Sequence, residues 1–270
     1  MARVETTKAR RLAVITGASS GIGYELARQF AQHDFDLLVV AEDAGIVQAA
    51  ERLEALGVRV ESMQVDLAEF EGVEKLYERI QYAGRPVDAI AINAGVGVGG
   101  DFARETDLKA ELNLISLNIT SSVHLAKRVI KDMVARGEGR VLFTSSIAAA
   151  MPGPFEAVYS ASKAFLLSFS ESIRNELKDT GVTVTALMPG PTETNFFHRA
   201  GMDDTRVGQQ EKDSPELVAK QGFEALMAGA DKVVAGSLKN KAFVAAASVL
   251  PLTTTAELHR ALSEPGSGRH

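Results

Sequence analysis

The feature that most constrains the fold of this 270-residue chain is a glycine-rich segment, Thr16–Gly23, reading TGASSGIG. It follows directly on the apolar run Arg11–Thr16, which predicts a buried strand. After it, Ile22, Leu26 and Phe30 recur every four residues and predict one face of a helix. The free N–H groups and positive dipole end of a helix that begins at a glycine turn suit a pyrophosphate. The turn therefore predicts a βα unit that binds phosphate groups.

The rest of the chain alternates apolar runs with helical patterns. We expect further strands over 36–41, 58–65, 87–92, 140–144, 182–188 and 232–235, with helices over 44–56, 69–83, 107–136 and 157–178 between them. Such alternation predicts an α/β fold with a parallel sheet covered on both faces. A doubly wound sheet of about seven strands fits better than a (β/α)₈ barrel, which needs eight units.

We expect one domain, 1–270, because no repeat or low-complexity linker divides the chain. An irregular insertion, 191–213, is the predicted substrate lid, and 236–270 is a C-terminal extension. The extension is expected to dock on its own domain, on a partner subunit or at a membrane surface. Its last residues, Glu264–His270, are expected to be frayed.

Composition excludes several classes of function. The chain has no cysteine, which removes disulfide scaffolds, thiolate metal sites and cysteine nucleophiles. Its five histidines include no HExxH pair, so no metal is expected. A net charge of −6 argues against nucleic acid. No run of about 18 apolar residues predicts a membrane span, and no signal peptide is apparent, so the expected location is cytoplasmic.

Tyr159 and Lys163 lie four residues apart on the helix predicted over 157–178 and so share one face. A neighbouring ammonium favours the phenolate and lowers the pKa of a tyrosine, which suits proton exchange with an alcohol or alkoxide. Spacing alone does not decide this, because Tyr24 and Arg28 form a similar pair. The context separates the two pairs: Tyr24 lies in the first helix, after the glycine turn, whereas Tyr159 follows the fifth strand and its end at Thr144–Ser146.

Ligands of open parallel sheets bind outside the carboxyl ends of the strands. Ser146, the segment Asn93–Gly95 and the pair Pro189–Gly190 all fall at such ends. At the end of the second strand, Glu42 and Asp43 lie about 20 residues after the glycine turn, where an acidic residue binds the adenosine ribose of NAD. A solvated acidic loop is the other interpretation of this pair.

Taken together, these residues resemble the short-chain dehydrogenase/reductase family, over roughly Leu12 to Ala235. The matching positions are the TGxxxGxG motif at Thr16–Gly23, Asn93–Gly95, Asp66 after the third strand, Asn118, Ser146 thirteen residues before Tyr159, the YxxxK motif of Tyr159 and Lys163, and Pro189–Gly190 with Thr194. Ser145 is the neighbouring alternative to Ser146. The resemblance implies a Rossmann fold and an NAD(P)-dependent oxidoreductase.

The resemblance also implies roles for individual residues. Tyr159 would be the general acid/base, Ser146 would bind the substrate oxygen, Lys163 would bind the nicotinamide ribose and lower the pKa of Tyr159, and Asn118 would hold a water. The expected cofactor contacts are Gly17, Ser19, Ser20, Gly21, Ile22, Gly23, Glu42, Asp66, Asn93, Gly95, Tyr159, Lys163, Pro189, Gly190, Thr192 and Thr194.

The sequence departs from the family pattern where the cofactor is chosen. NAD-dependent members usually have Asp at the position of Ala41, and NADP-dependent members often have Arg at that of Glu42 and a basic residue at that of Ser20. Neither Glu42 nor Ser20 is a basic residue, so the sequence favours NAD(H) as cofactor, with NADP(H) as the alternative.

The implied substrate is a small-molecule ketone or secondary alcohol, and the candidate pocket residues favour a hydrophobic one. Phe196, Phe197, Met151, Phe155 and Met202 are candidates for an apolar pocket wall, with packing of the lid as the alternative. The family resemblance also implies a homodimer or homotetramer. Two other functions remain: a catalytically idle dinucleotide sensor, and a serine hydrolase with Ser19 as nucleophile in GASSG and His198 or His259 as base.

Overall fold

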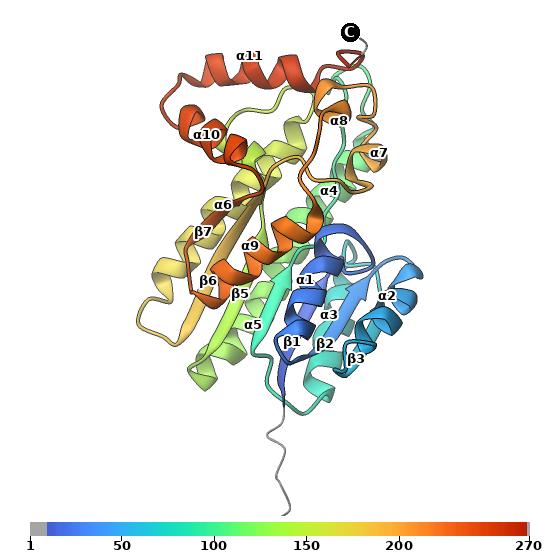
Figure 1. Cartoon of the computed structure of the whole chain (residues 1–270), viewed down its shortest axis with the longest axis vertical. Coiled ribbons are helices and arrows are strands. Elements are labelled where there is room, and N and C mark those ends of the chain that lie inside the picture. Colours follow the sequence, from blue (N-terminus) through green and yellow to red (C-terminus); the bar gives the residue numbers. More distant parts are fainter. Residues whose placement is uncertain (1–9, 269–270) are drawn as a thin grey trace, which may run out of the picture.

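Seven parallel strands form one sheet in the computed structural model, which describes residues 10–268. The strands are β1 (Arg11–Thr16), β2 (Phe35–Ala41), β3 (Val60–Gln64), β4 (Ala89–Ile92), β5 (Gly139–Thr144), β6 (Val182–Pro189) and β7 (Lys232–Ala235). Their order is β3-β2-β1-β4-β5-β6-β7, so the direction of winding reverses between β1 and β4. The predicted doubly wound sheet is confirmed, and its carboxyl ends lie along the upper edge in Figure 1.

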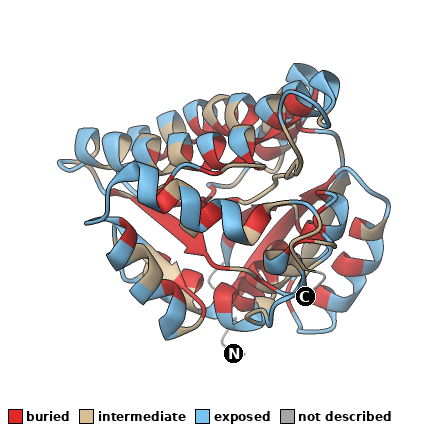
Figure 2. Cartoon of the chain, turned by 90° about the horizontal axis from the view of Figure 1, so that it is seen from above, coloured by how far each residue is buried: buried red, intermediate tan, exposed pale blue. Residues whose placement is uncertain are grey.

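Helices cover both faces of this sheet. One face is packed by α1 (Gly21–Gln32), α2 (Gly45–Glu54) and α9 (Pro215–Met227). The other is packed by α3 (Phe70–Tyr82), α5 (Ser121–Arg136) and α6 (Ala157–Glu176). Figure 2 shows the result: the central strands are buried, whereas the edge strands β3 and β7 are mostly of intermediate exposure and the outer sides of the helices are exposed. Because both faces of the sheet are covered, the central strands are continuous apolar runs in the sequence, whereas the helices show the 3.6-residue period of one buried face.

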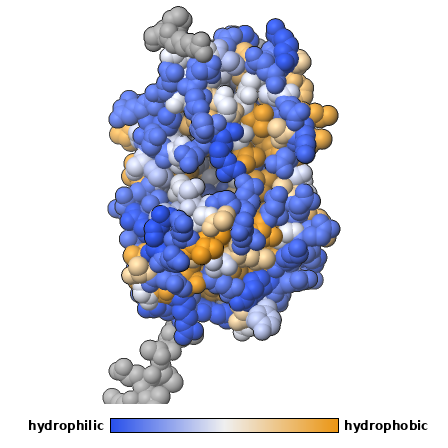
Figure 3. Space-filling model, turned by 90° about the vertical axis from the view of Figure 1, so that its right-hand side faces the viewer, coloured by the Kyte–Doolittle hydropathy of each residue, from blue (hydrophilic) through white to orange (hydrophobic). Residues whose placement is uncertain are grey.

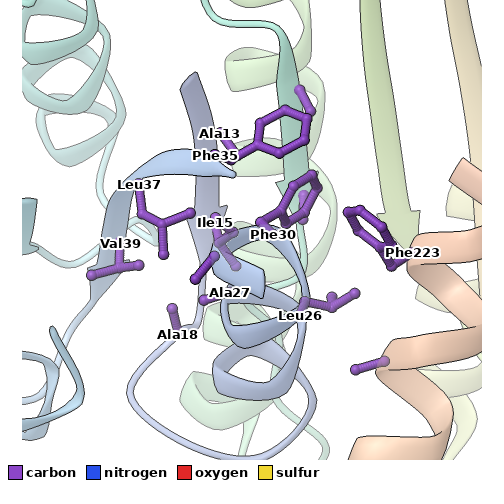
Figure 4. Packing of buried hydrophobic residues seen from close by; sticks show 14 of the residues in the cluster. Ala13, Ile15, Ala18, Leu26, Ala27, Phe30, Phe35, Leu37, Val39 and Phe223 are labelled. Atoms are coloured by element: carbon purple, nitrogen blue, oxygen red, sulfur yellow. The ribbon is translucent and has the colours of Figure 1, made fainter. Parts of the chain in front are cut away.

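The core is divided into two layers by the sheet itself. Ala13 and Ile15 of β1 belong to one cluster, whereas Leu12 and Val14 belong to the other. In the first cluster Phe30 packs edge-on between two other phenylalanines, 5.1 Å from Phe35 and 5.0 Å from Phe223 between ring centroids (Figure 4). These contacts tie α1 and α9 to the start of β2. On the surface, Figure 3 shows a face dominated by hydrophilic side chains with smaller hydrophobic patches between them.

The helix predicted over 107–136 is not continuous. It consists of α4 (Leu108–Ile115), a π-helical turn at Ser116–Thr120, and α5. The wider π turn disturbs the usual carbonyl pairing, and the hydroxyls of Ser121 and Ser122 donate to the carbonyls of Leu117 and Asn118. The apolar periodicity runs through this segment unbroken, which is why the sequence predicts one helix.

The C-terminal extension docks on its own domain. It forms α10 (Leu238–Ala247), which contacts β7, and α11 (Leu252–Ser263), which contacts the short helix α8 (Arg206–Gln209) at the top of the molecule in Figure 1. Another short helix, α7 (Phe196–Arg199), precedes α8 in the 191–213 insertion. The prediction that the chain frays from Glu264 is wrong for the residues described. Gly266 N–H donates to the Asp204 carboxylate and Gly268 N–H to the Asp204 carbonyl, each at 2.9 Å.

No helix within residues 10–268 is long and apolar enough to cross a membrane. No group of three or more potential metal-ligating side chains is found there either.

Candidate active site

The turn between β1 and α1 has the conformation that its glycines predict. Gly17 and Gly21 have φ values of +67° and +56°, which other residues rarely adopt. A Cβ on Gly23 would lie 2.0 Å from the carbonyl oxygen of Gly17, so no side chain fits there. Ser20 begins the helix without a side-chain hydrogen bond to it. The N–H groups at the start of α1 are therefore not capped by their own N-cap side chain, which fits a bound pyrophosphate.

A hydrogen-bonded brace holds the strand ends on either side of the winding reversal. The Thr16 hydroxyl accepts from the N–H groups of Asn93 and Ala94, at 2.9 and 3.0 Å. The Asn93 amide nitrogen donates to the Thr16 carbonyl, and the Thr144 hydroxyl donates to the Asn93 amide oxygen at 3.0 Å. Ends of β1, β4 and β5 are thereby fixed relative to one another.

One cavity of about 660 Å³ extends along these strand ends. It is lined by all sixteen predicted cofactor contacts, namely Gly17, Ser19, Ser20, Gly21, Ile22, Gly23, Glu42, Asp66, Asn93, Gly95, Tyr159, Lys163, Pro189, Gly190, Thr192 and Thr194. Ser146 also lines it, whereas Asn118 lies behind the wall with no exposed surface. Residues that are up to 177 positions apart in the sequence thus share one hollow, as the strand-end argument predicts.

Tyr159, Ser146 and Lys163 meet in this cavity. The Ser146 side chain hydrogen-bonds Tyr159, and its oxygen also accepts from the N–H of Ala148 at 3.1 Å. Lys163 Nζ donates to the Thr144 carbonyl at 2.9 Å and lies 5.6 Å from the centre of the Tyr159 ring. Ser145, the alternative to Ser146, points elsewhere, because its hydroxyl donates to the Lys163 carbonyl.

Asn118 lies in the π turn and holds the loop after β4. Its amide oxygen accepts from the Val96 N–H, and its amide nitrogen donates to the Val96 carbonyl, both at 3.0 Å. The same nitrogen donates to the Ser162 hydroxyl at 3.1 Å. The π turn therefore brings an asparagine into contact with both the Asn93–Gly95 loop and the helix that carries Tyr159.

Burial dominates the ionisation of the central residues. It raises the pKa of Tyr159, the nearby Glu156 carboxylate raises it further, and the hydrogen bond with Ser146 lowers it. Burial lowers the pKa of Lys163 to about 8. The lowering of the Tyr159 pKa that the resemblance implies is thus not seen in the protein alone, where desolvation and a carboxylate outweigh the opposing hydrogen bond.

Glu156 is a site residue that the sequence reasoning missed. Its side chain lines the cavity together with His259 and Ser263 of α11. The Ser263 hydroxyl donates to Glu156 Oε2 at 2.9 Å, and His259 Nε2 lies 3.4 Å from the same oxygen. Burial raises the pKa of Glu156 to about 7. No motif marks these residues, because they meet only through the docking of α11.

At the opposite end of the cavity, both predicted acidic residues have partners. The Ser19 hydroxyl donates to the Asp43 carboxylate at 2.7 Å. Arg199 of α7 pairs with Glu42 at 2.6 Å. The arginine comes from the 191–213 insertion and lies 157 residues from Glu42 in the sequence, so no local pattern predicts it.

The apolar wall is smaller than the sequence predicts. Phe196 and Phe197 line the cavity, and Phe196 packs 5.1 Å from the Tyr159 ring. Met202 is instead buried against Phe197 and Ala200 within the insertion itself. Met151 and Phe155 do not line the cavity either, so they are not part of the predicted wall.

The hydrolase arrangement is not formed. The Ser19 hydroxyl is directed to Asp43 and not to an imidazole. His198 pairs with Asp203, and His259 lies beside Glu156 at the other end of the cavity. A serine nucleophile requires a hydrogen-bonded base, and neither candidate histidine is in that position.

Comparison with known proteins shows the family of the chain. The family model described as short chain dehydrogenase matches residues 11–205. Among curated proteins, the chain is 28% identical to the ketoacyl reductase HetN of Nostoc, over 92% of this chain and 82% of that protein.

Solved structures of short-chain dehydrogenases are also similar to this chain. A short-chain dehydrogenase from Sphingobium yanoikuyae in complex with NADPH is 30% identical, with a TM-score of 0.77 over 83% of this chain and 87% of that one. A short chain dehydrogenase/reductase from Burkholderia phymatum in complex with NAD has the same fold, with a TM-score of 0.81 at 22% identity, over 95% of this chain and 97% of that one.

Proposed function

This chain belongs to the short chain dehydrogenase family, and on that premise we propose that it transfers a hydride between a nicotinamide cofactor and a ketone or secondary alcohol. The observation that carries the proposal is the convergence of Tyr159, Ser146 and Lys163 in the cavity that begins at the phosphate-binding turn. A sensor that only binds the dinucleotide has no need of this arrangement.

The proposed chemistry follows from the positions of the side chains. When bound, the nicotinamide supplies or accepts the hydride. During reduction Tyr159 donates its phenolic proton to the substrate oxygen as negative charge develops there, and during oxidation it takes that proton back. Ser146 hydrogen-bonds the same oxygen. Lys163, protonated below its pKa of about 8, stabilises the phenolate left after donation and holds the ribose of the cofactor.

Asn118 acts through the positions of its neighbours. Its hydrogen bonds to Val96 hold the loop that lines the nicotinamide end of the cavity. We propose that a water bound near this loop relays the proton between Lys163 and solvent.

Substitution of Tyr159 by phenylalanine tests the general acid/base. It removes only the phenolic hydroxyl, and general acid–base catalysis contributes about 10²–10⁴-fold to a rate. We expect kcat to fall by at least about 10² on any carbonyl substrate found, with the cofactor Kd changed less than about threefold. Cofactor binding without turnover by the unaltered protein, across a broad panel of ketones and alcohols, would instead support the sensor.

We propose NAD(H) as the preferred cofactor. In support, Glu42 and Asp43 line the cavity at the carboxyl end of β2, where two carboxyl groups would repel a 2′-phosphate, and Arg199 is already paired with Glu42. NADH should therefore bind more tightly than NADPH in parallel titrations. Replacement of Glu42 by alanine should raise NADPH affinity by about tenfold, because it removes one negative charge and frees the guanidinium of Arg199 for phosphate. Tighter binding of NADPH by the unaltered protein would contradict the proposal.

Two further assignments complete the proposed function. The insertion 191–213 is the proposed lid, and its support is that Phe196, Phe197 and Arg199 of this segment line the cavity. The chain is a homodimer or homotetramer, and the exposed row Leu108, Leu112 and Ile115 on α4 is a candidate interface, testable by light scattering.

A further inference from the structure

The substrate end of the cavity contains a buried carboxyl group that the proposed reaction does not use. Glu156 is 6% exposed and lies at the start of α6, three residues before Tyr159. Its side chain makes no hydrogen bond to the helix N-terminus, which is the usual role of a polar residue at that position. One carboxyl oxygen, Oε2, accepts from Ser263, whereas Oε1 has no hydrogen-bond partner within residues 10–268.

The charge of Glu156 is also uncompensated. Its nearest ionisable neighbour is His259, which is 7% exposed and whose pKa is lowered by burial, so the imidazole is neutral at neutral pH. In residues 10–268 no lysine or arginine forms an ion pair with Glu156. A buried carboxylate without a cation is costly, and burial accordingly raises the pKa of Glu156 to about 7. A group that donates a hydrogen bond to Oε1 would relieve this cost.

The local backbone holds Glu156 in this position. Phe155, the residue before it, has a φ of +64°, which is strained for a phenylalanine. The Phe155 carbonyl accepts from the Gly100 N–H at 2.8 Å, and Arg260 of α11 lies over the Phe155 ring at 4.9 Å. Contacts from two other parts of the chain thus keep the carboxyl directed toward the cavity and α11.

Apolar side chains of the β5–α6 connection and the insertion also line the cavity, namely Ile147, Ala148, Phe196 and Phe197. Lys212 lines it as well, with its ammonium 5.3 Å from the centre of the Phe197 ring. A ligand bound against Tyr159 would therefore meet both hydrocarbon and the carboxyl group of Glu156.

We propose that Glu156 and His259 form a polar subsite of the substrate pocket, which binds a hydrogen-bond donor carried by the substrate away from its reacting oxygen. The donor is a hydroxyl or an ammonium group, since both donate to a carboxylate. This inference rests on the proposed function, because it takes the ligand of the cavity to be the substrate of Tyr159. It replaces a uniformly hydrophobic substrate with an amphipathic one.

Three acetophenones of matched size test the subsite; they carry an ethyl, a hydroxymethyl or an aminomethyl group at the ring position opposite the acetyl group. The corresponding meta isomers present the same groups in a second direction from the ring. Their Kd values are measured by calorimetry with the full chain loaded with NAD⁺, so that binding does not depend on turnover. A hydrogen bond to a charged group predicts tighter binding of at least one donor-bearing ligand, on the order of tenfold over the ethyl ligand.

Two variants distinguish the two donors. In Glu156→Gln the amide still accepts from a hydroxyl but no longer attracts a cation, so a preference for the aminomethyl ligand should disappear and one for the hydroxymethyl ligand should persist. In Glu156→Leu both preferences should disappear. Glu176→Gln makes the same chemical change at an exposed position of α6 and should leave all the ratios unchanged. A general structural role would weaken all three ligands alike and leave the ratios unchanged.

The outcomes separate this inference from the proposed function. Equal affinity for the three ligands, no binding of any of them, or ratios that survive in Glu156→Leu would overturn the subsite. If a variant fails to fold, the comparison of ligands on the unaltered protein still decides. Selective binding with no hydride transfer to any ketone would keep the subsite and reject the proposed reaction.

Discussion

Tyr159 has to act in both directions of the proposed reaction, and its surroundings do not favour the two equally. Burial and the Glu156 carboxylate both raise its pKa. A high pKa keeps the phenol protonated and ready to protonate an alkoxide, but it makes the phenolate needed for alcohol oxidation scarce at neutral pH. Residue 156 therefore influences the chemistry as well as the shape of the pocket.

The pH profile of Glu156→Gln follows from this argument. Removal of a negative charge beside Tyr159 stabilises the phenolate, so the pKa of Tyr159 falls and alcohol oxidation reaches half its maximal rate at a lower pH. The profile is measured as kcat/KM between pH 6 and 11, with a secondary alcohol that carries no other donor. Glu176→Gln should match the unaltered protein. If oxidation by Glu156→Gln reaches half its maximal rate at the same or a higher pH than in the unaltered protein, the carboxylate does not act on Tyr159.

At the scale of the elements, the site depends on how the strand ends are joined across the winding reversal. Parallel strands β1 and β4 pair only over Ala13–Ile15 and Ala89–Ala91, so the backbone beyond them needs other partners. Thr16 supplies one, because its single hydroxyl accepts from two N–H groups of the loop after β4. The loop that lines the cofactor end of the cavity is thus held by one side chain of the neighbouring strand.

Thr16→Val tests this brace with almost no change in shape. Valine leaves the N–H groups of Asn93 and Ala94 without their acceptor, and an unsatisfied buried donor costs about 1–3 kcal/mol. We expect the free energy of unfolding in urea to fall by roughly 2 kcal/mol, with an unchanged slope, and cofactor binding to weaken. Thr183→Val on β6 is the matched control, since the Thr183 hydroxyl is buried without a partner and its loss should be close to neutral. Equal destabilisation by the two substitutions would contradict the brace.

At the scale of the whole molecule, the sequence predicts what is encoded locally. Apolar runs and glycine spacing mark every strand to within about two residues, and the strand-end rule gathers the predicted cofactor contacts around one cavity. The sequence did not predict the π turn at Asn118, because the helical periodicity of apolar residues continues through it. The sequence did not predict the roles of Glu156 and Arg199 for another reason. Glu156 contacts Ser263 across 107 residues and Arg199 contacts Glu42 across 157, and no local sequence pattern predicts such contacts.

The chain end supplies another contact of this kind, between the segment after α11 and the proposed lid. Gly266 and Gly268 donate to Asp204, and the Ser267 hydroxyl accepts from the Arg206 N–H at 3.1 Å. These bonds join the C-terminal turn to the 191–213 insertion, on the side of the cavity where α11 already contributes His259 and Ser263. Residues 266–268 should therefore hold the proposed lid over the substrate, in addition to packing against the domain.

A chain shortened to end at Ser263 keeps α11 but loses these three hydrogen bonds and a fourth, from Arg206 Nε to the Ser267 carbonyl at 3.2 Å. At about 1 kcal/mol net for each bond, partly offset by water, the closed lid should lose enough population to raise the KM for substrate by about tenfold. The cofactor Kd should change less than about twofold, and hydrogen exchange should become faster over 196–210. Glu264→Gln, which disturbs only an exposed pair with Arg260, should change neither quantity. If exchange and KM stay the same after truncation, the lid is held by its own contacts, chiefly the packing of Phe197 and Met202, and not by the chain end.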